Sequence, residues 1–122
     1  MATSLIKSTA YDLSDISSAF VLRSSMVGTG TVIKAHLCDG YFIDFSIKIP
    51  STVTIREGTY ITESIPSKYL PLVGEGMYMT CRKGQGAVTV CILPEGVQIW
   101  TDPTGLTGSL FGHAFYRANI YA

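Results

Sequence analysis

Apolar and polar residues alternate with a period of two along much of this chain. In residues 41–49, Tyr41 and every second residue after it are apolar, and the residues between them are mainly polar. Such alternation predicts a half-buried antiparallel strand, and Pro50 ends it because proline cannot donate a hydrogen bond to a sheet. Residues 31–38 form a second β-forming run, and the Asp39-Gly40 pair between the two runs predicts a hairpin turn.

Further short β-forming runs follow, separated by glycine and proline turns. Strands are expected at residues 76–82, 87–92, 97–100 and 113–121, with shorter β-forming stretches at 19–23 and 52–60. We expect residues 61–71 to form an ordered, irregular connection between strands, which we call the crossing segment. We expect residues 101–112 to form a loop. Short strands with turn signals about every 8–12 residues are typical of an all-β sandwich or of a sheet closed on itself. We therefore predict an antiparallel, jelly-roll-like β-sandwich of about seven or eight strands over residues 19–122.

Residues 1–18 have a different composition, rich in serine and threonine. Within them, Asp12 or Ser14 is a suitable cap for a short helix that begins around residues 11–16. A flexible or partner-ordered N-terminal arm is the alternative. The full length of 122 residues leaves room for one domain only.

The chain is neutral and poor in charge, which excludes several classes of protein. Charged residues make up 15% and hydrophobic residues 47%, with a formal net charge of zero. This composition argues against disorder, against a nucleic-acid partner bound through basic charge and against a cationic membrane-surface segment. No apolar run approaches the ~20 residues that span a bilayer, so no membrane insertion is expected. A neutral, apolar chain tends to associate, which favours contact between copies of the chain.

The residues that usually carry chemistry do not form a catalytic or metal-binding pattern. Cys38, Cys81 and Cys91 are odd in number and lack a Cys-x-x-Cys spacing, so we expect buried free thiols in a reducing compartment. His36 and His113 have no further ligands at close spacing, and no carboxylates are paired for acid–base work. We therefore predict a non-enzymatic protein without a cofactor.

Aromatic residues are the remaining candidates for function. Strand alternation predicts that Tyr41, Phe45, Phe115 and Tyr121 point inward, whereas Trp100 lies opposite the core face of its strand. A tryptophan in that position marks a subunit interface or a binding surface, and interfaces are enriched in this residue. The polar, glycine-rich loop that follows is a second candidate, with a plain surface connection as the alternative. The candidate receptor surface consists of Trp100, Asp102, Thr104, Thr107 and Ser109.

One segment carries a resemblance to a known family. Residues 65–71 resemble the Leu-Pro-x-Gly-Tyr-Arg-Pro crossing of bacteriophage tail-fibre and receptor-binding head domains, through Pro66, Tyr69 and Pro71. Lys68 and Leu70 depart from the glycine and arginine of that motif. Downstream, the turn at Gly96 is similar to the family's Asp-Gly turn between two strands, with glutamate in place of aspartate. The resemblance covers roughly residues 30–121.

The resemblance implies a homotrimer of β-sandwiches at the tip of a fibre. It implies a virion structural protein, made in the host cytoplasm, that contacts other virion proteins and binds a host-surface saccharide or protein. The family shares no catalytic residues to carry over. A fibre tip normally follows a long shaft, so this chain is either a truncated fibre or a free-standing module that docks through its arm.

Two alternatives to adhesion remain open at this point. The first is a capsid decoration or head-fibre protein anchored by its N-terminal arm. The second is a non-viral carbohydrate-binding module or a small carbohydrate-active enzyme, which the lack of a carboxylate pair disfavours.

Overall fold

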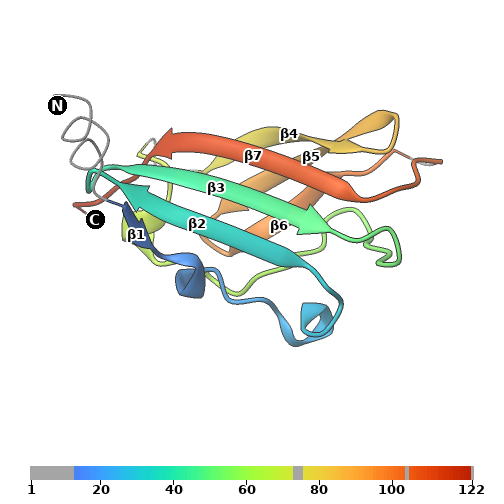
Figure 1. The fold of residues 1–122 in the computed structure, drawn as a ribbon, viewed down its shortest axis with the longest axis horizontal. Helices are drawn as coiled ribbons and strands as arrows, with labels where there is room; N and C mark the ends of the chain where they lie inside the picture. Colours follow the sequence, from blue (N-terminus) through green and yellow to red (C-terminus); the bar gives the residue numbers. More distant parts are fainter. Residues whose placement is uncertain (1–12, 73–75, 104, 122) are drawn as a thin grey trace, which may run out of the picture.

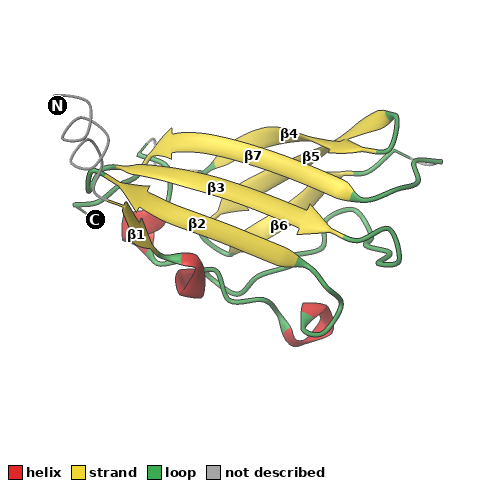
Figure 2. Cartoon of the chain, in the orientation of Figure 1, coloured by secondary structure: helices red, strands yellow, loops and turns green. Residues whose placement is uncertain are grey.

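A computed structural model describes residues 13–72, 76–103 and 105–121. In this part of the chain, seven antiparallel strands form one sheet in the order β1-β2-β3-β7-β4-β5-β6, which confirms the all-β prediction (Figures 1 and 2). The strands are β1 (Leu13–Asp15), β2 (Val32–Cys38), β3 (Phe42–Ile49), β4 (Met77–Lys83), β5 (Gly86–Leu93), β6 (Gly96–Thr101) and β7 (Leu110–Arg117).

Helical structure is limited to three short 3-10 turns in the described residues. These are η1 (Ser17–Ala19), η2 (Ser24–Met26) and η3 (Ser67–Tyr69). No helix in the described part of the chain is long and apolar enough to cross a membrane.

The β2–β3 hairpin forms as the alternation predicts. Asp39 and Gly40 both have positive φ, 54° and 75°, which gives the turn a twist that matches the flanking strands. Along β3, Ile43, Phe45 and the two isoleucines that follow at every second position are buried.

The two separate sheets of the predicted sandwich are not seen in the strand pairing, because β7 joins both halves. It pairs with β3 along its full length, but with β4 only at Phe111 and Leu110. Beyond these pairs β4 diverges, and the sheet curves so that β5 and β6 lie behind β3 and β7 (Figure 1). The curved sheet encloses a single core, in which side chains of β3 such as Phe45 belong to the same cluster as Val90 of β5 and Ile99 of β6.

Residues 58–63 cover the free edge of β6. The Ile61 N–H donates to the Val97 carbonyl at 2.8 Å, and the Ile99 N–H donates to the Thr59 carbonyl at 2.9 Å. On its other side this segment bonds to residues 21–23. The β-forming stretches at 19–23 and 52–60 therefore supply isolated bridges rather than full strands.

The crossing segment is ordered and irregular, as predicted. Pro66 starts η3, whose Tyr69 N–H donates to the Pro66 carbonyl at 2.9 Å. The phenol of Tyr116 in β7 donates to the Tyr69 carbonyl at 2.7 Å. Pro71 is buried and bridges to Ala118 after β7, so the crossing is fixed against the end of that strand.

The start of the described chain differs from the predicted short helix. Leu13–Asp15 form a strand because they pair in register with residues 36–38 of β2. Ile16 follows and is buried in the core. Residues 13–16 are thus an integral part of the sheet and core, and residues 1–12 lie outside the described residues.

Three of the four aromatics expected inside are exposed, so that prediction was wrong for them. Phe45 is buried as expected, but Phe115, Tyr41 and Tyr121 are 58%, 41% and 79% exposed. The alternation of β7 turns Ala114 inward, so its neighbour Phe115 must point outward. Tyr41 lies in the hairpin turn, and Tyr121 follows the last strand. The loop predicted at residues 101–112 is also shorter, since β6 extends to Thr101 and β7 begins at Leu110.

Candidate functional site

Every second side chain of β1, β2, β3 and β7 points away from the core, and together these side chains form what we call the outer face. None of them is buried, and no loop of the described chain crosses in front of β2, β3 and β7 (Figure 2). The strand register aligns them in four rows: Leu13, Cys38, Phe42 and Arg117; Asp15, His36, Asp44 and Phe115; Lys34, Ser46 and His113; and Val32, Lys48 and Phe111.

One end of the outer face carries a small cluster of exposed apolar side chains. The rings of Phe42 and Phe115 stack with centroids 5.4 Å apart and planes 9° apart. Leu13 of β1 lies one row away and is 60% exposed. These three residues, which we call the aromatic patch, border a shallow pocket of about 320 Å³ that also includes Cys38 and Asp44. Contiguous apolar surface of this kind marks interaction sites.

The other end of the outer face carries positive charge around an aromatic ring. Where β4 leaves β7, a groove of about 610 Å³ opens. It is lined by Lys34, Lys48, Arg82 and His113 around the ring of Phe111. We call this the cationic groove. The Lys48 ammonium lies 5.7 Å from the centroid of the Phe111 ring, and none of the ten described residues that line the groove is acidic.

A histidine–aspartate pair separates the patch from the groove. His113 Nε2 lies 2.5 Å from Asp44 Oδ1, and both side chains are solvent-accessible. His36 is in register with Asp44 on the neighbouring strand, so the fold brings both histidines to opposite sides of one carboxylate. Across the described residues, no group of three His, Cys, Asp or Glu side chains is arranged to hold a metal ion.

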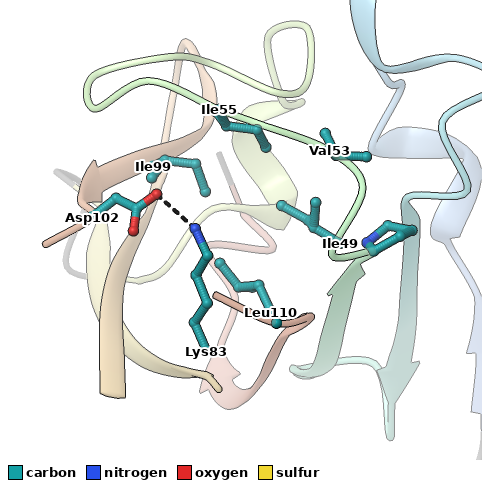
Figure 3. Close-up of a pocket in the computed structure, with 9 residues that line it drawn as sticks. Ile49, Val53, Ile55, Lys83, Ile99, Asp102 and Leu110 are labelled. Carbon is teal, nitrogen blue, oxygen red and sulfur yellow. Dashed lines mark hydrogen bonds and ion pairs between the residues drawn. The ribbon is translucent and has the colours of Figure 1, made fainter. Parts of the chain in front are cut away.

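A second ion pair lies at the end of the core. Lys83 Nζ and Asp102 Oδ2 are 3.0 Å apart, with side chains 18% and 15% exposed. Ile49, Ile99 and Leu110 surround the pair (Figure 3). The other carboxylate oxygen of Asp102 has no hydrogen-bond partner. Because each charge is paired with the other inside the fold, this ion pair stabilises the structure and is not a candidate ligand site.

Trp100 lies on the outer side of β6, as predicted. It is 47% exposed and contacts Tyr78 of β4 edge-on, with ring centroids 5.4 Å apart. Gln98 of β6 is buried because residues 58–63 cover it, and its Nε2 donates to the Gly58 carbonyl at 3.0 Å.

The other predicted surface residues do not join Trp100 in one site. Asp102 turns inward to Lys83. Thr107 lines a separate shallow pocket beside Lys83 and Leu106. Ser109 is half-buried before β7, and Thr104 lies outside the described residues.

The three cysteines are free thiols, and two of them are buried as expected, whereas Cys38 is not. Cys81 and Cys91 are fully buried, and burial raises the pKa of each thiol to about 11. Cys38 is half-buried on the outer face, where desolvation, followed by the charges of Asp44 and Asp39, raises its pKa. All three thiols are therefore protonated near neutral pH.

The residues of the patch and the groove were missed by the sequence interpretation. The alternation of residues 41–49 does indicate that Phe42 and Lys48 point away from the core. It does not reveal which side chains of β7 and β4 lie beside them, because that depends on the strand register. The register places Phe115 one row from Phe42, and it places Phe111 between Lys48 and Arg82.

No family model matches this chain, and no curated protein matches it.

Proposed function

We propose that this chain is a non-catalytic virion structural protein, the head domain of a phage tail fibre or receptor-binding protein that adheres to the host surface. The observation that carries the proposal is the outer face, where exposed aromatic and cationic side chains share one side of a rigid sheet. Recognition surfaces built on a rigid scaffold combine apolar contact area with a few polar groups that orient the ligand.

The crossing segment supports the assignment to this family. Pro66, Tyr69 and Pro71, which carry the resemblance, serve here to fix an irregular connection against β7. None of the three belongs to the four rows of the outer face. This division suits a family whose members keep the crossing and vary the binding residues.

We assign the aromatic patch to contacts between copies in a homotrimer. Its three side chains expose apolar surface on a chain of zero net charge, and both properties favour association. Several copies in one assembly also multiply the affinity of a weak host contact.

The oligomeric state tests this assignment. Size-exclusion chromatography with light scattering at micromolar concentration is expected to give a trimer for the unaltered chain and smaller species for Phe115→Ser. The matched control is Val27→Ser, which removes another exposed apolar side chain outside the patch and is expected to leave the trimer intact. A clean monomer for the unaltered chain contradicts the assignment.

Deleting residues 2–12 separates adhesion from capsid decoration. The deletion stops before Leu13 because β1 pairs with β2 and Ile16 is buried. If the trimer persists but no longer associates with phage particles, while labelled protein still binds host cells, the segment is an anchor. Absence of host-cell binding by the full chain contradicts adhesion and leaves decoration as the function.

A further inference from the structure

The cationic groove concentrates charge in a neutral molecule. Three of the nine lysine and arginine residues of the chain, Lys34, Lys48 and Arg82, line it. Lys48 and Arg82 occupy the same row on either side of Phe111, and Lys34 lies diagonally across β2 and β3 from Lys48. Lys34 and Lys48 lie on adjacent strands, and Arg82 lies two strands away from Lys48. Because like charges repel each other, this arrangement is stabilised when an anion lies among the three cations.

The carboxylates nearest in the strand register do not fill this role. Asp44 is held by His113 at 2.5 Å. Hydrogen bonds with the side chain and the N–H of Ser17, the latter at 2.9 Å, lower the pKa of Asp15, with smaller electrostatic contributions from His36 and Lys34. Neither carboxylate lines the groove. The positive charge there faces solvent and is open to an external anion.

The remaining groups of the groove suit a sugar ring. Phe111 is 49% exposed and offers an aromatic face to the C–H groups of a pyranose. Ser46 and Thr80 add hydroxyl groups that both donate and accept hydrogen bonds. A ligand that matches the whole set has an apolar face, several hydroxyls and an acidic substituent.

We propose that the cationic groove binds an acidic saccharide, with Lys34, Lys48 and Arg82 holding its acidic group and Phe111 stacking on its ring. This inference rests on the proposed adhesive function and names the ligand class. Nucleic acid is the less suitable polyanion, because the chain has no basic excess to follow a phosphate backbone. A few local charges beside one aromatic ring fit an anionic group on an otherwise neutral sugar chain.

The test uses the full chain on an array in which acidic glycans are paired with neutral counterparts, including oligogalacturonate and its methyl ester. Acidic members are expected to bind, and their neutral counterparts to bind about tenfold more weakly or not at all. Lys48→Gln and Arg82→Gln are each expected to weaken binding about tenfold. Both residues are exposed, so circular dichroism and melting temperature are expected to remain unchanged.

Lys68→Gln is the matched control. Lys68 is also an exposed lysine above an aromatic ring, 5.1 Å from the Tyr69 centroid, but it lies on η3 outside the groove. Unchanged binding by this variant, together with weaker binding by Lys48→Gln, assigns the effect to the groove.

Four outcomes overturn the inference. These are preference for neutral glycans, equal loss of binding for Lys68→Gln and Lys48→Gln, binding of a single-stranded oligonucleotide as strong as that of any glycan, and absence of glycan binding. Labelled protein on host cells then separates the two proposals. If cells are bound equally by the unaltered chain and by Lys48→Gln, adhesion stands and the groove is not its site. If cells are not bound at all, the adhesive function fails as well.

Discussion

Replacing Gly96 with alanine adds one methyl group where β6 meets residues 58–63. Gly96 has a φ of +142°, and a Cβ at this position would lie 2.5 Å from the Thr62 carbonyl oxygen and 2.9 Å from Thr62 Oγ1. Real Cβ atoms do not approach backbone oxygens so closely, so residues 58–63 must move away from β6. That movement weakens two hydrogen bonds of Val97: its N–H to Thr62 Oγ1 at 2.9 Å and its carbonyl to the Ile61 N–H at 2.8 Å.

The expected loss of unfolding free energy is about 4 kcal/mol. A non-glycine residue in a sparsely populated backbone region costs about 1–3 kcal/mol, and each weakened hydrogen bond costs about 1 kcal/mol. A loss of this size is a large part of the roughly 5–15 kcal/mol that stabilises a typical domain. It corresponds to a fall in melting temperature of about 15 °C.

Urea denaturation followed by tryptophan fluorescence measures this loss. Trp100 is the single tryptophan of the chain and lies on β6 itself. Gly28→Ala is the control, since Gly28 also has a positive φ, +81°, but a Cβ there meets no atom within 4 Å. The control is expected to lose about 1 kcal/mol from backbone strain alone. If Gly96→Ala costs no more than Gly28→Ala, the close approach to Thr62 does not constrain this position and the reasoning is refuted.

Three further predictions concern buried polar groups. Thr62→Val is expected to cost about 1–3 kcal/mol in urea denaturation, because it leaves the buried Val97 N–H without its acceptor; an unchanged midpoint contradicts this. Lys83→Met is expected to cost about 1–3 kcal/mol by leaving Asp102 unpaired, and Lys83→Met/Asp102→Leu to recover most of that loss. Burial raises the pKa of the Tyr116 phenol, so the unfolded chain releases this proton first and the phenol lowers stability above about pH 10 by up to ~1.4 kcal/mol per pH unit, in addition to the fall above about pH 9 that Cys81 and Cys91 cause in the same way. Urea denaturation from pH 8 to pH 11.5 measures this slope, which Tyr116→Phe should reduce.

Local sequence patterns determined much of the secondary structure. The β2–β3 hairpin followed from its alternation and from Asp39-Gly40, because a tight turn of positive φ has few suitable residues. The strands β4, β5 and β6 and the irregular crossing were also predicted close to their observed bounds, whereas β7 begins three residues earlier and ends four residues earlier than expected. These features depend on interactions between residues that are near in sequence, so a single sequence reveals them.

Which side chains lie together in the candidate site depends on pairing between strands that are far apart in the sequence. Phe115 was expected inside because β7 has apolar residues on both of its faces, so alternation alone does not show which positions face the core. The strand 13–15 was missed for a related reason, since three residues form a strand only when a neighbour such as β2 is present.

The sequence by itself determined that this is an all-β chain of short antiparallel strands, neutral and rich in apolar residues, with free cysteines. The tertiary structure alone decided that the strands form one curved sheet rather than two, because β7 bonds to both β3 and β4. It also decided that Phe42 lies against Phe115, and that Lys48 and Arg82 flank Phe111. Each of these contacts joins residues far apart in the chain, and their distance is set by sheet register and curvature, which no local pattern encodes.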